Sequence, residues 1–227
     1  MKILIACECS QTICIEFRKL GVECYSCDIN EEYGGHPEWH IKGDCIDVMY
    51  GSCDFVTRDG KRHHMDKWDC VIAHPPCTYL CRAQSCLYNC ERFGDRYVDN
   101  RLEKQRKGIE FFLKFTELSC PYLIENPIGI MSKVYRRADQ VIQPYMFGDS
   151  ATKATCLWLH DLPKLIPTNI VSKGEKHYFP ASNAMGEWYF NTSKLPPKER
   201  SRVRSKTFPG IAKAIATQYY QYLRFFT

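Results

Sequence analysis

The sequence predicts an α/β fold, in which a doubly wound and mostly parallel sheet is covered by helices on both faces. Three observations support this prediction: short apolar runs of strand length, amphipathic segments of helix length between them, and polar residues directly after the runs. The chain has 227 residues, 44% of them hydrophobic, which is enough for one sizeable core. We expect a single domain over residues 1–227, with a short loop-rich insertion at about 160–195.

The N-terminal part has the pattern strand, helix, strand. The run from Lys2 to Cys7 is apolar after its first residue, which is typical of a strand buried on both faces of a parallel sheet. Thr12 to Leu20 has apolar residues at helical spacing, and Gly21 suits a left-handed C-cap. Val22 to Cys27 is the second expected strand. The connection between the two parallel strands should be right-handed.

The later segments continue the alternation of strands and helices. The polar stretch with His63 and His64 is expected to be a loop. The alternating basic residues from Arg200 to Lys206 suggest an extended segment facing phosphates, and the alternative is solvated surface charge. The expected elements are a short strand or turn within 41–48, strands at 68–74 and 122–126, a helix at 102–118, an antiparallel edge pair at 141–142 and 155–159, and a helix at 211–223.

The chain contains fourteen cysteines, an unusual number. The opening MKILIACECSQ is charged too soon for a signal peptide, and a chain this rich in core residues needs no disulfide framework. We therefore expect reduced thiols in a cytoplasmic protein, most of them small buried residues. No apolar run approaches the roughly 20 residues of a membrane span. The net charge of +5 permits a polyanionic partner without requiring one.

Ligands of doubly wound sheets bind beyond the carboxyl ends of the strands, so the residues that follow each strand are the candidates for a site. Asp28 follows the second strand, where nucleoside-binding sheets place an acid for the ribose hydroxyls; the alternative is a turn or N-cap aspartate. The first turn, Cys7 to Gln11, has no glycine, which disfavours a dinucleotide. A cofactor without phosphates does not need a glycine-rich loop.

Cys77 is the most informative single residue. Pro75 and Pro76 fix the backbone directly after a buried strand and present the Cys77 thiol at the sheet edge. Such a thiol can be a nucleophile, especially if a helix N-terminus lowers its pKa, or it can be one more buried cysteine. Glu125 and Asn126, one strand further along, place a carboxylate beside the same cleft. A thiol and a carboxyl group facing one planar base suggest covalent addition to a pyrimidine ring.

Cys77 also belongs to a series of cysteines with the spacing Cys-x3-Cys-x4-Cys-x3-Cys. Structural zinc sites typically use pairs separated by two residues, and zinc ligation would occupy the candidate nucleophile. We therefore predict no metal site, although Cys81, Cys86 and Cys90 can be read as zinc ligands or as buried thiols.

Pro75-Pro76-Cys77 and Glu125-Asn126 resemble the Pro-Pro-Cys and Glu-Asn-Val motifs of S-adenosylmethionine-dependent cytosine-C5 DNA methyltransferases. The whole chain looks closer still to short proteins of this type from bacteriophages. The segment between Leu159 and Lys194 is much shorter than the target-recognition domain of full-length members. The stretches that support the resemblance are ACECSQTICIEFRKLGVECYSCDI, HPPCTYL, IENPI, FGDSATKATCLWL, PKLIPTN and RSKTFPGIAKAIATQY.

The resemblance implies a Rossmann-like methyltransferase fold with a small or absent target-recognition domain, S-adenosylmethionine as cofactor, DNA as partner and a host bacterial cytoplasm as location. It implies that Cys77 attacks C6 of cytosine and that Glu125 binds the N3 and exocyclic edge. Duplex DNA would have to present a flipped base. The implied cofactor residues are Cys7, Glu8, Ser10, Asp28 for the ribose, Asp44 for the adenine, and Pro75. The implied substrate residues are Pro76, Asn126, Lys153, Arg202 and Arg204.

The shortness of the segment after Leu159 leaves the substrate open between single-stranded DNA, DNA read without sequence specificity, and a free nucleotide. Two further hypotheses therefore remain beside DNA methylation. One is a pyrimidine nucleotide-modifying enzyme that uses the same thiol addition. The other is a catalytically silent nucleic-acid or nucleotide-binding protein on this fold.

Overall fold

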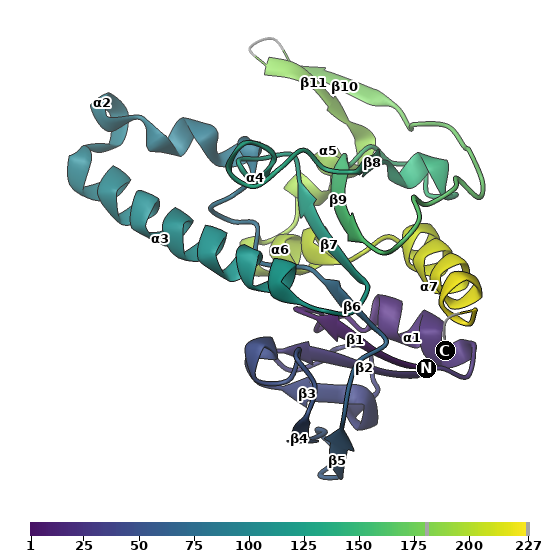
Figure 1. Cartoon of the computed structure of the whole chain (residues 1–227). Helices are drawn as coiled ribbons and strands as arrows, with labels where there is room; N and C mark the ends of the chain where they lie inside the picture. The colour runs from purple at the N-terminus through teal and green to yellow at the C-terminus, as the bar shows by residue number, and fades with distance from the viewer. Residues whose placement is uncertain (180–181, 226–227) are drawn as a thin grey trace.

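The computed structural model describes residues 1–179 and 182–225, which build a seven-stranded mixed sheet with helices on both faces (Figure 1). The strand order is β3-β2-β1-β6-β7-β9-β8. Strand β9 runs in the opposite direction to the other six and is antiparallel to both β7 and β8. The α/β prediction with a mostly parallel sheet is thus confirmed. The strands are β1 (Lys2–Ala6), β2 (Glu23–Asp28), β3 (His40–Lys42), β6 (Cys70–Ala73), β7 (Tyr122–Pro127), β8 (Gln140–Ile142) and β9 (Thr155–His160).

The central strands are buried on both faces, as the continuous apolar run of β1 predicts. Ile3 and Ile5 of β1 pack on one face with α1 (Thr12–Lys19) and α7 (Pro209–Leu223), which lie side by side. Leu4 packs on the other face. That second face is covered by the C-terminal part of α3 (Asp95–Lys114). Each large apolar side chain buried in this way contributes roughly 1.5–3 kcal/mol, so both helical layers are needed for stability.

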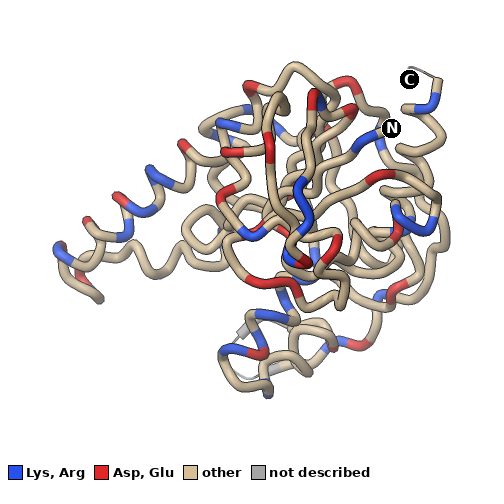
Figure 2. Tube along the Cα trace, turned by 90° about the horizontal axis from the view of Figure 1, so that it is seen from below, with Lys and Arg blue, Asp and Glu red and all other residues tan. Residues whose placement is uncertain are grey.

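Several boundaries differ from the sequence prediction. Helix α3 begins seven residues earlier than the expected 102, because polar helix-forming residues extend it beyond its apolar stripe. The N-terminal end of α3 and α2 (Cys90–Phe93) form an arm that projects from the sheet (Figure 1). Positive and negative residues are interleaved along this arm, as Figure 2 shows. The arm is connected to β6 through the 3-10 helix η3 (Arg82–Tyr88).

Two polar segments fold into regular elements that the sequence reading missed. The stretch with His63 and His64 is β5 (Arg62–Met65), paired with β4 (Cys53–Val56), because alternate residues such as Phe55 and Met65 are buried. The basic segment is not extended but forms α6 (Pro197–Ser205), which begins with a proline at its first position and consists mainly of helix-forming charged residues.

The expected loop-rich insertion is only partly irregular. It contains the hairpin β10 (Lys176–Phe179) with β11 (Ser182–Gly186), followed by α5 (Glu187–Ser193). Residues 180 and 181 lie outside the described part. The other expected elements are confirmed with small shifts, including the antiparallel edge pair β8 and β9, and Gly21 has the expected left-handed φ of 74°. The remaining short helices are α4 (Met131–Val134), η1 (Pro37–Trp39), η2 (Cys45–Asp47), η4 (Phe115–Glu117) and η5 (Pro144–Met146).

Candidate active site

A cleft of about 1240 Å³ opens at the carboxyl ends of β1, β2, β6 and β7. It lies where the strand order reverses around β1, the place where doubly wound sheets bind ligands. The predicted site residues that line it are Cys7, Glu8, Ser10, Asp28, Asp44, Pro75, Pro76, Cys77, Glu125, Asn126, Lys153 and Arg204. Arg202 does not line the cleft and is exposed on α6.

The loops that carry Cys77 and Glu125 are hydrogen-bonded to each other. The Asn126 side-chain amide, which is buried, donates to the Pro75 carbonyl at 2.7 Å. Two backbone bonds continue the contact, from Arg82 to the Ile128 carbonyl at 2.9 Å and from Ile130 to the Leu80 carbonyl at 2.9 Å. Asn126, predicted as a substrate contact, thus has its amide engaged in fixing the Pro75-Pro76 turn.

The Cys77 thiol is not activated in the free protein. Burial, and after it the Glu125 carboxylate, raise its pKa to about 11, and the nearby Lys153 ammonium opposes both effects. The suggestion of a pKa lowered by a helix N-terminus is therefore wrong. At neutral pH the Cys77 side chain is therefore almost entirely in its thiol form.

Glu125 is partly buried and nevertheless favours its charged form. Burial acts to raise its pKa, but the hydrogen bond and charge of His74, together with Lys153, outweigh burial and leave the pKa below its ordinary value. His74 Nδ1 donates to Glu125 Oε2 at 3.1 Å. Sequence reasoning did not assign His74 a role, although it follows a buried strand just as Cys77 does.

The turn after β1 is stabilised by side chains rather than by glycines. Cys7 and Gln11 both have left-handed φ values, 60° and 57°. The Glu8 carboxylate accepts hydrogen bonds from the Ile13 and Cys14 amides at 2.8 and 3.3 Å, so it caps α1 in place of a ligand. Burial raises the Glu8 pKa, and these amides and His74 partly counter the effect.

The acidic residues of the next two strand ends remain accessible from the cleft. Asp28 Oδ1 accepts from the Asn30 amide and side chain, both at 2.8 Å, and among the described residues its Oδ2 has no hydrogen-bond partner. Asp44 caps η2 through a 3.0 Å bond from Ile46 and is exposed. Both residues therefore make turn or cap contacts while they line the cleft. For Asp28, such a contact is the alternative that the sequence left open beside ribose binding.

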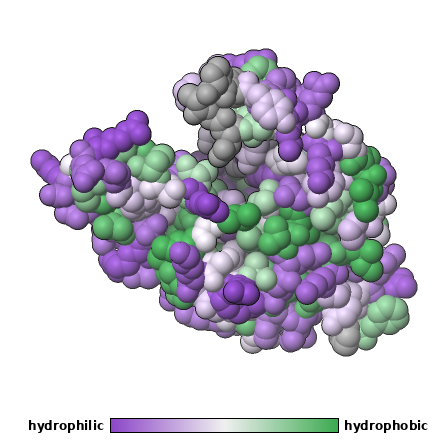
Figure 3. Space-filling view, turned by 90° about the horizontal axis from the view of Figure 1, so that it is seen from above, coloured by the Kyte–Doolittle hydropathy of each residue, from purple (hydrophilic) through white to green (hydrophobic). Residues whose placement is uncertain are grey.

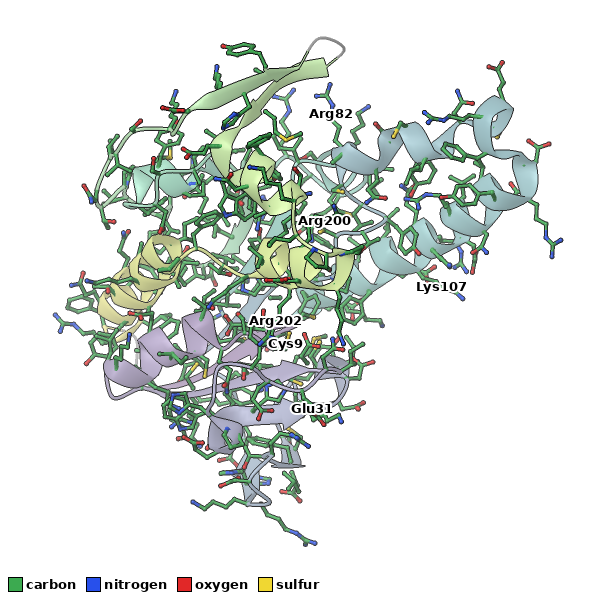
Figure 4. All side chains as sticks on the ribbon, turned by 180° about the vertical axis from the view of Figure 1, so that it is seen from behind. Cys9, Glu31, Arg82, Lys107, Arg200 and Arg202 are labelled. Carbon is green, nitrogen blue, oxygen red and sulfur yellow. The ribbon has the colours of Figure 1, made fainter. Side chains whose placement is uncertain are left out.

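Two arginines of α6 are held by contacts with other parts of the protein, and a third lines the cleft. Arg204 donates to the Thr192 hydroxyl at 2.9 Å and to the Tyr189 carbonyl at 3.1 Å. Arg202 lies 3.8 Å above the Tyr33 ring, and beside Cys9 in Figure 4. Arg200, like Arg82, lines the cleft. Helix α6 therefore crosses the cleft, and Arg204 has little freedom to bind phosphate.

The segment after Cys77 is ordered by an arginine that sequence reasoning did not single out. Arg101 of α3 lies between the Tyr79 and Tyr88 rings, 5.0 Å from each. Gln105 donates to the Tyr79 carbonyl at 2.8 Å and to the Tyr88 hydroxyl at 3.0 Å. These contacts attach η3 to the arm and so define the side of the cleft next to Cys77. From above, a hollow lies between the arm and the β10–β11 hairpin (Figure 3).

The cysteines do not form a metal cluster. No group of three or more His, Cys, Asp or Glu side chains within residues 1–179 and 182–225 could hold a metal ion. All fourteen thiols, each in the described part, are free; six are buried, so the expectation that most are buried is wrong. Cys86 and Cys90 are exposed.

Fold and site together define an α/β protein whose switch-point cleft contains a thiol and a carboxylate. The sequence matches no protein-family model and no curated protein. None of its helices, as far as the chain is described, is long and apolar enough to cross a bilayer.

Gly129 tests the contact between the two loops. A Cβ at this position would lie 2.0 Å from the Leu80 carbonyl oxygen, so Gly129→Ala must push the loops apart. We expect a loss of about 1–3 kcal/mol in the free energy of unfolding, measured by urea denaturation. Gly108→Ala is the matched control, because its Cβ meets the Leu80 side chain at an ordinary 3.4 Å and improves helix propensity by up to about 1 kcal/mol. Equal stability of the two variants would contradict the role of Gly129.

The charges around Cys77 predict its reactivity. Alkylation of Cys77 by iodoacetamide, followed by peptide mass spectrometry, should accelerate about tenfold per pH unit from pH 7 and level off near pH 11. Lys153→Met removes a charge that favours the thiolate, so alkylation at pH 8 should slow by roughly three- to tenfold. A Cys77 that reacts as fast at pH 7 as at pH 10 would refute this account.

Proposed function

We propose that the protein is an S-adenosylmethionine-dependent methyltransferase that adds a methyl group to C5 of cytosine in DNA through a covalent Cys77 adduct. The observation that carries the proposal is the convergence of Cys77 and Glu125, from the ends of two adjacent strands, in one cleft with Asp28 and Asp44. The cleft volume exceeds the roughly 300–1000 Å³ of ordinary small-molecule sites, which suits a cofactor and an extruded base together.

The chemistry of the cleft fits this cofactor. The Glu8 carboxylate accepts the amides at the α1 N-terminus, so these amides are not free to bind phosphate groups. S-adenosylmethionine has no phosphate groups and does not need them. Asp28 and Asp44 offer carboxylate oxygens for hydroxyl and amino groups and favour a cationic ligand. When bound, the cofactor supplies an electrophilic methyl group to C5.

The charges of the cleft are divided between its two halves. Asp28 and Asp44 line the β1–β2 side, whereas Arg82, Lys153 and Arg200 add positive charge to the part of the lining that contains Cys77 and the Glu125 carboxylate. In Figure 4, Arg82 and Arg200 lie above Cys9, which belongs to the turn after β1. This division supports a cationic cofactor on one side and a phosphodiester backbone on the other.

The residues of the site have distinct tasks in the proposed reaction. The Cys77 sulfur adds to C6 of the pyrimidine, which moves electron density to C5. Glu125 hydrogen-bonds N3 and the exocyclic edge and stabilises the charge that develops there. Loss of the C5 proton to a base then expels the thiolate and restores the double bond. Because the free thiol is largely protonated, the bound base and Lys153 must favour the thiolate.

An oligonucleotide containing 5-fluorocytosine tests the proposal, because fluorine at C5 blocks the final elimination. With S-adenosylmethionine, the wild-type protein should form a covalent adduct seen by mass spectrometry, on single-stranded or duplex DNA. Cys77→Ser should form none, and Cys86→Ser, at an exposed thiol, should match the wild type. No adduct with either DNA form would overturn the proposal. An adduct only with the free fluorinated nucleotide would instead establish the nucleotide-modifying enzyme.

Glu125→Gln separates the acid from the nucleophile. Adduct formation should fall by at least about 100-fold, because the proton and charge that N3 requires are lost. Alkylation of Cys77 by iodoacetamide should become faster, because the Glu125 charge that disfavours the thiolate is gone. Parallel loss of both reactivities would mean that the substitution only disrupts the site.

A further inference from the structure

His74 occupies an unusual position at the end of β6. Its Nδ1 donates to Glu125 Oε2 at 3.1 Å, and its side chain is 12% exposed. Its Nε2 is buried and has no hydrogen-bond partner among the described residues. Since a buried polar atom without a partner destabilises the folded protein, the position of His74 needs an explanation beyond packing.

The charged groups near His74 come from three other segments. Glu8 lies on the turn after β1, Glu125 on β7, and Lys153 before β9. The charge of His74 acts on the Glu8 carboxylate, and its imidazole is hydrogen-bonded to Glu125. His74 therefore connects the turn after β1 with the end of β7.

A second, much smaller cavity adjoins the same residues. It has a volume of about 20 Å³ and is lined by His74, Glu125, Lys153 and hydroxyl-bearing residues such as Thr155 and Thr207. This volume accommodates one water molecule, and the hydroxyl groups with an imidazole nitrogen supply the two to four polar partners that a buried water needs.

We propose that His74 is a positioning residue that holds Glu125 and shares a single proton with it, while one buried water in the small cavity hydrogen-bonds His74 Nε2. This proposal rests on the proposed function. Moving the proton from Nδ1 to Oε2 breaks an N–H bond and forms an O–H bond, and the imidazolium–carboxylate pair becomes an imidazole and a carboxylic acid of the same total charge. The acid can then give this proton to N3 of the pyrimidine as the Cys77 thiolate adds to C6, and the elimination step returns it.

Two substitutions of His74 separate its hydrogen bond to Glu125 from its ability to hold the shared proton. His74→Asn keeps an N–H donor near the place of Nδ1 but cannot hold the extra proton, and His74→Leu has neither. We expect adduct formation to slow by about tenfold in His74→Asn and by at least about 100-fold in His74→Leu. The wild-type rate should rise and then fall with increasing pH, whereas in His74→Asn the falling limb should lie at lower pH, because Glu125 alone must then hold the proton for N3.

The matched control is His64→Asn. His64 also contacts carboxylates, Asp54 at 2.6 Å and Asp66 at 3.2 Å, but it lies exposed on β5. Its substitution should change neither the rate nor the pH profile. Identical rates and profiles for His74→Asn and His74→Leu would reduce His74 to a structural residue and overturn the proposal.

Nitrogen-15 NMR of the histidine side chains tests the pair without any substrate. In the wild type the His74 resonances should show a proton on Nδ1, and the Nδ1 resonance should shift in Glu125→Gln, because the carboxylate that accepts its hydrogen bond is gone. An unchanged Nδ1 resonance would refute the shared proton, whatever the enzyme does. A shifted Nδ1 resonance in a protein that forms no adduct would instead support the pair and refute the proposed function.

Discussion

The hydrogen bond from Asn126 to the Pro75 carbonyl is the contact on which the site depends. Strands β6 and β7 are adjacent and parallel, so the register of the sheet brings their ends to the same edge. Proline removes the backbone donors that would otherwise order the loop after β6, and the buried Asn126 amide provides a replacement from β7. The distance between thiol and carboxylate is thereby set by the sheet and not by flexible loops.

The same constraint explains which parts could be predicted from the sequence. Strand ends follow from apolar runs and prolines, so Cys77, Glu125 and Asp28 were found at the cleft edge by position alone. The hydrogen bond of His74 to Glu125 depends on the pairing of two strands distant in sequence, which no local pattern encodes. A histidine before two prolines has no periodic sequence pattern of its own, so the sequence does not distinguish His74 from other loop residues.

Two errors of the sequence reading have different physical causes. The alternating arginines of α6 suggest an extended segment. Alternation of charged residues indicates a strand only when the residues between them are apolar and buried, and α6 has no buried residues. The β4–β5 hairpin was missed because its buried residues, Phe55 and Met65, are single apolar residues within polar runs. In the hairpin the packing of these two residues against the sheet body decides the conformation, whereas α6 follows from its N-terminal proline and its helix-forming residues.

The raised pKa of Cys77 is consistent with the arrangement of charges around it. A carboxylate close to a thiol suppresses the thiolate, and this protects an accessible cysteine from reaction until a ligand alters the balance. In the proposed reaction, a pyrimidine protonated at N3 through Glu125 would place a positive charge against the Glu125 carboxylate and offset the negative charge that suppresses Cys77, so binding of the base and activation of the nucleophile would be one event. The low reactivity of the free thiol is what such a coupling requires, because the charge near Glu125 can control the ionisation of Cys77 only if the thiol is protonated before the base binds.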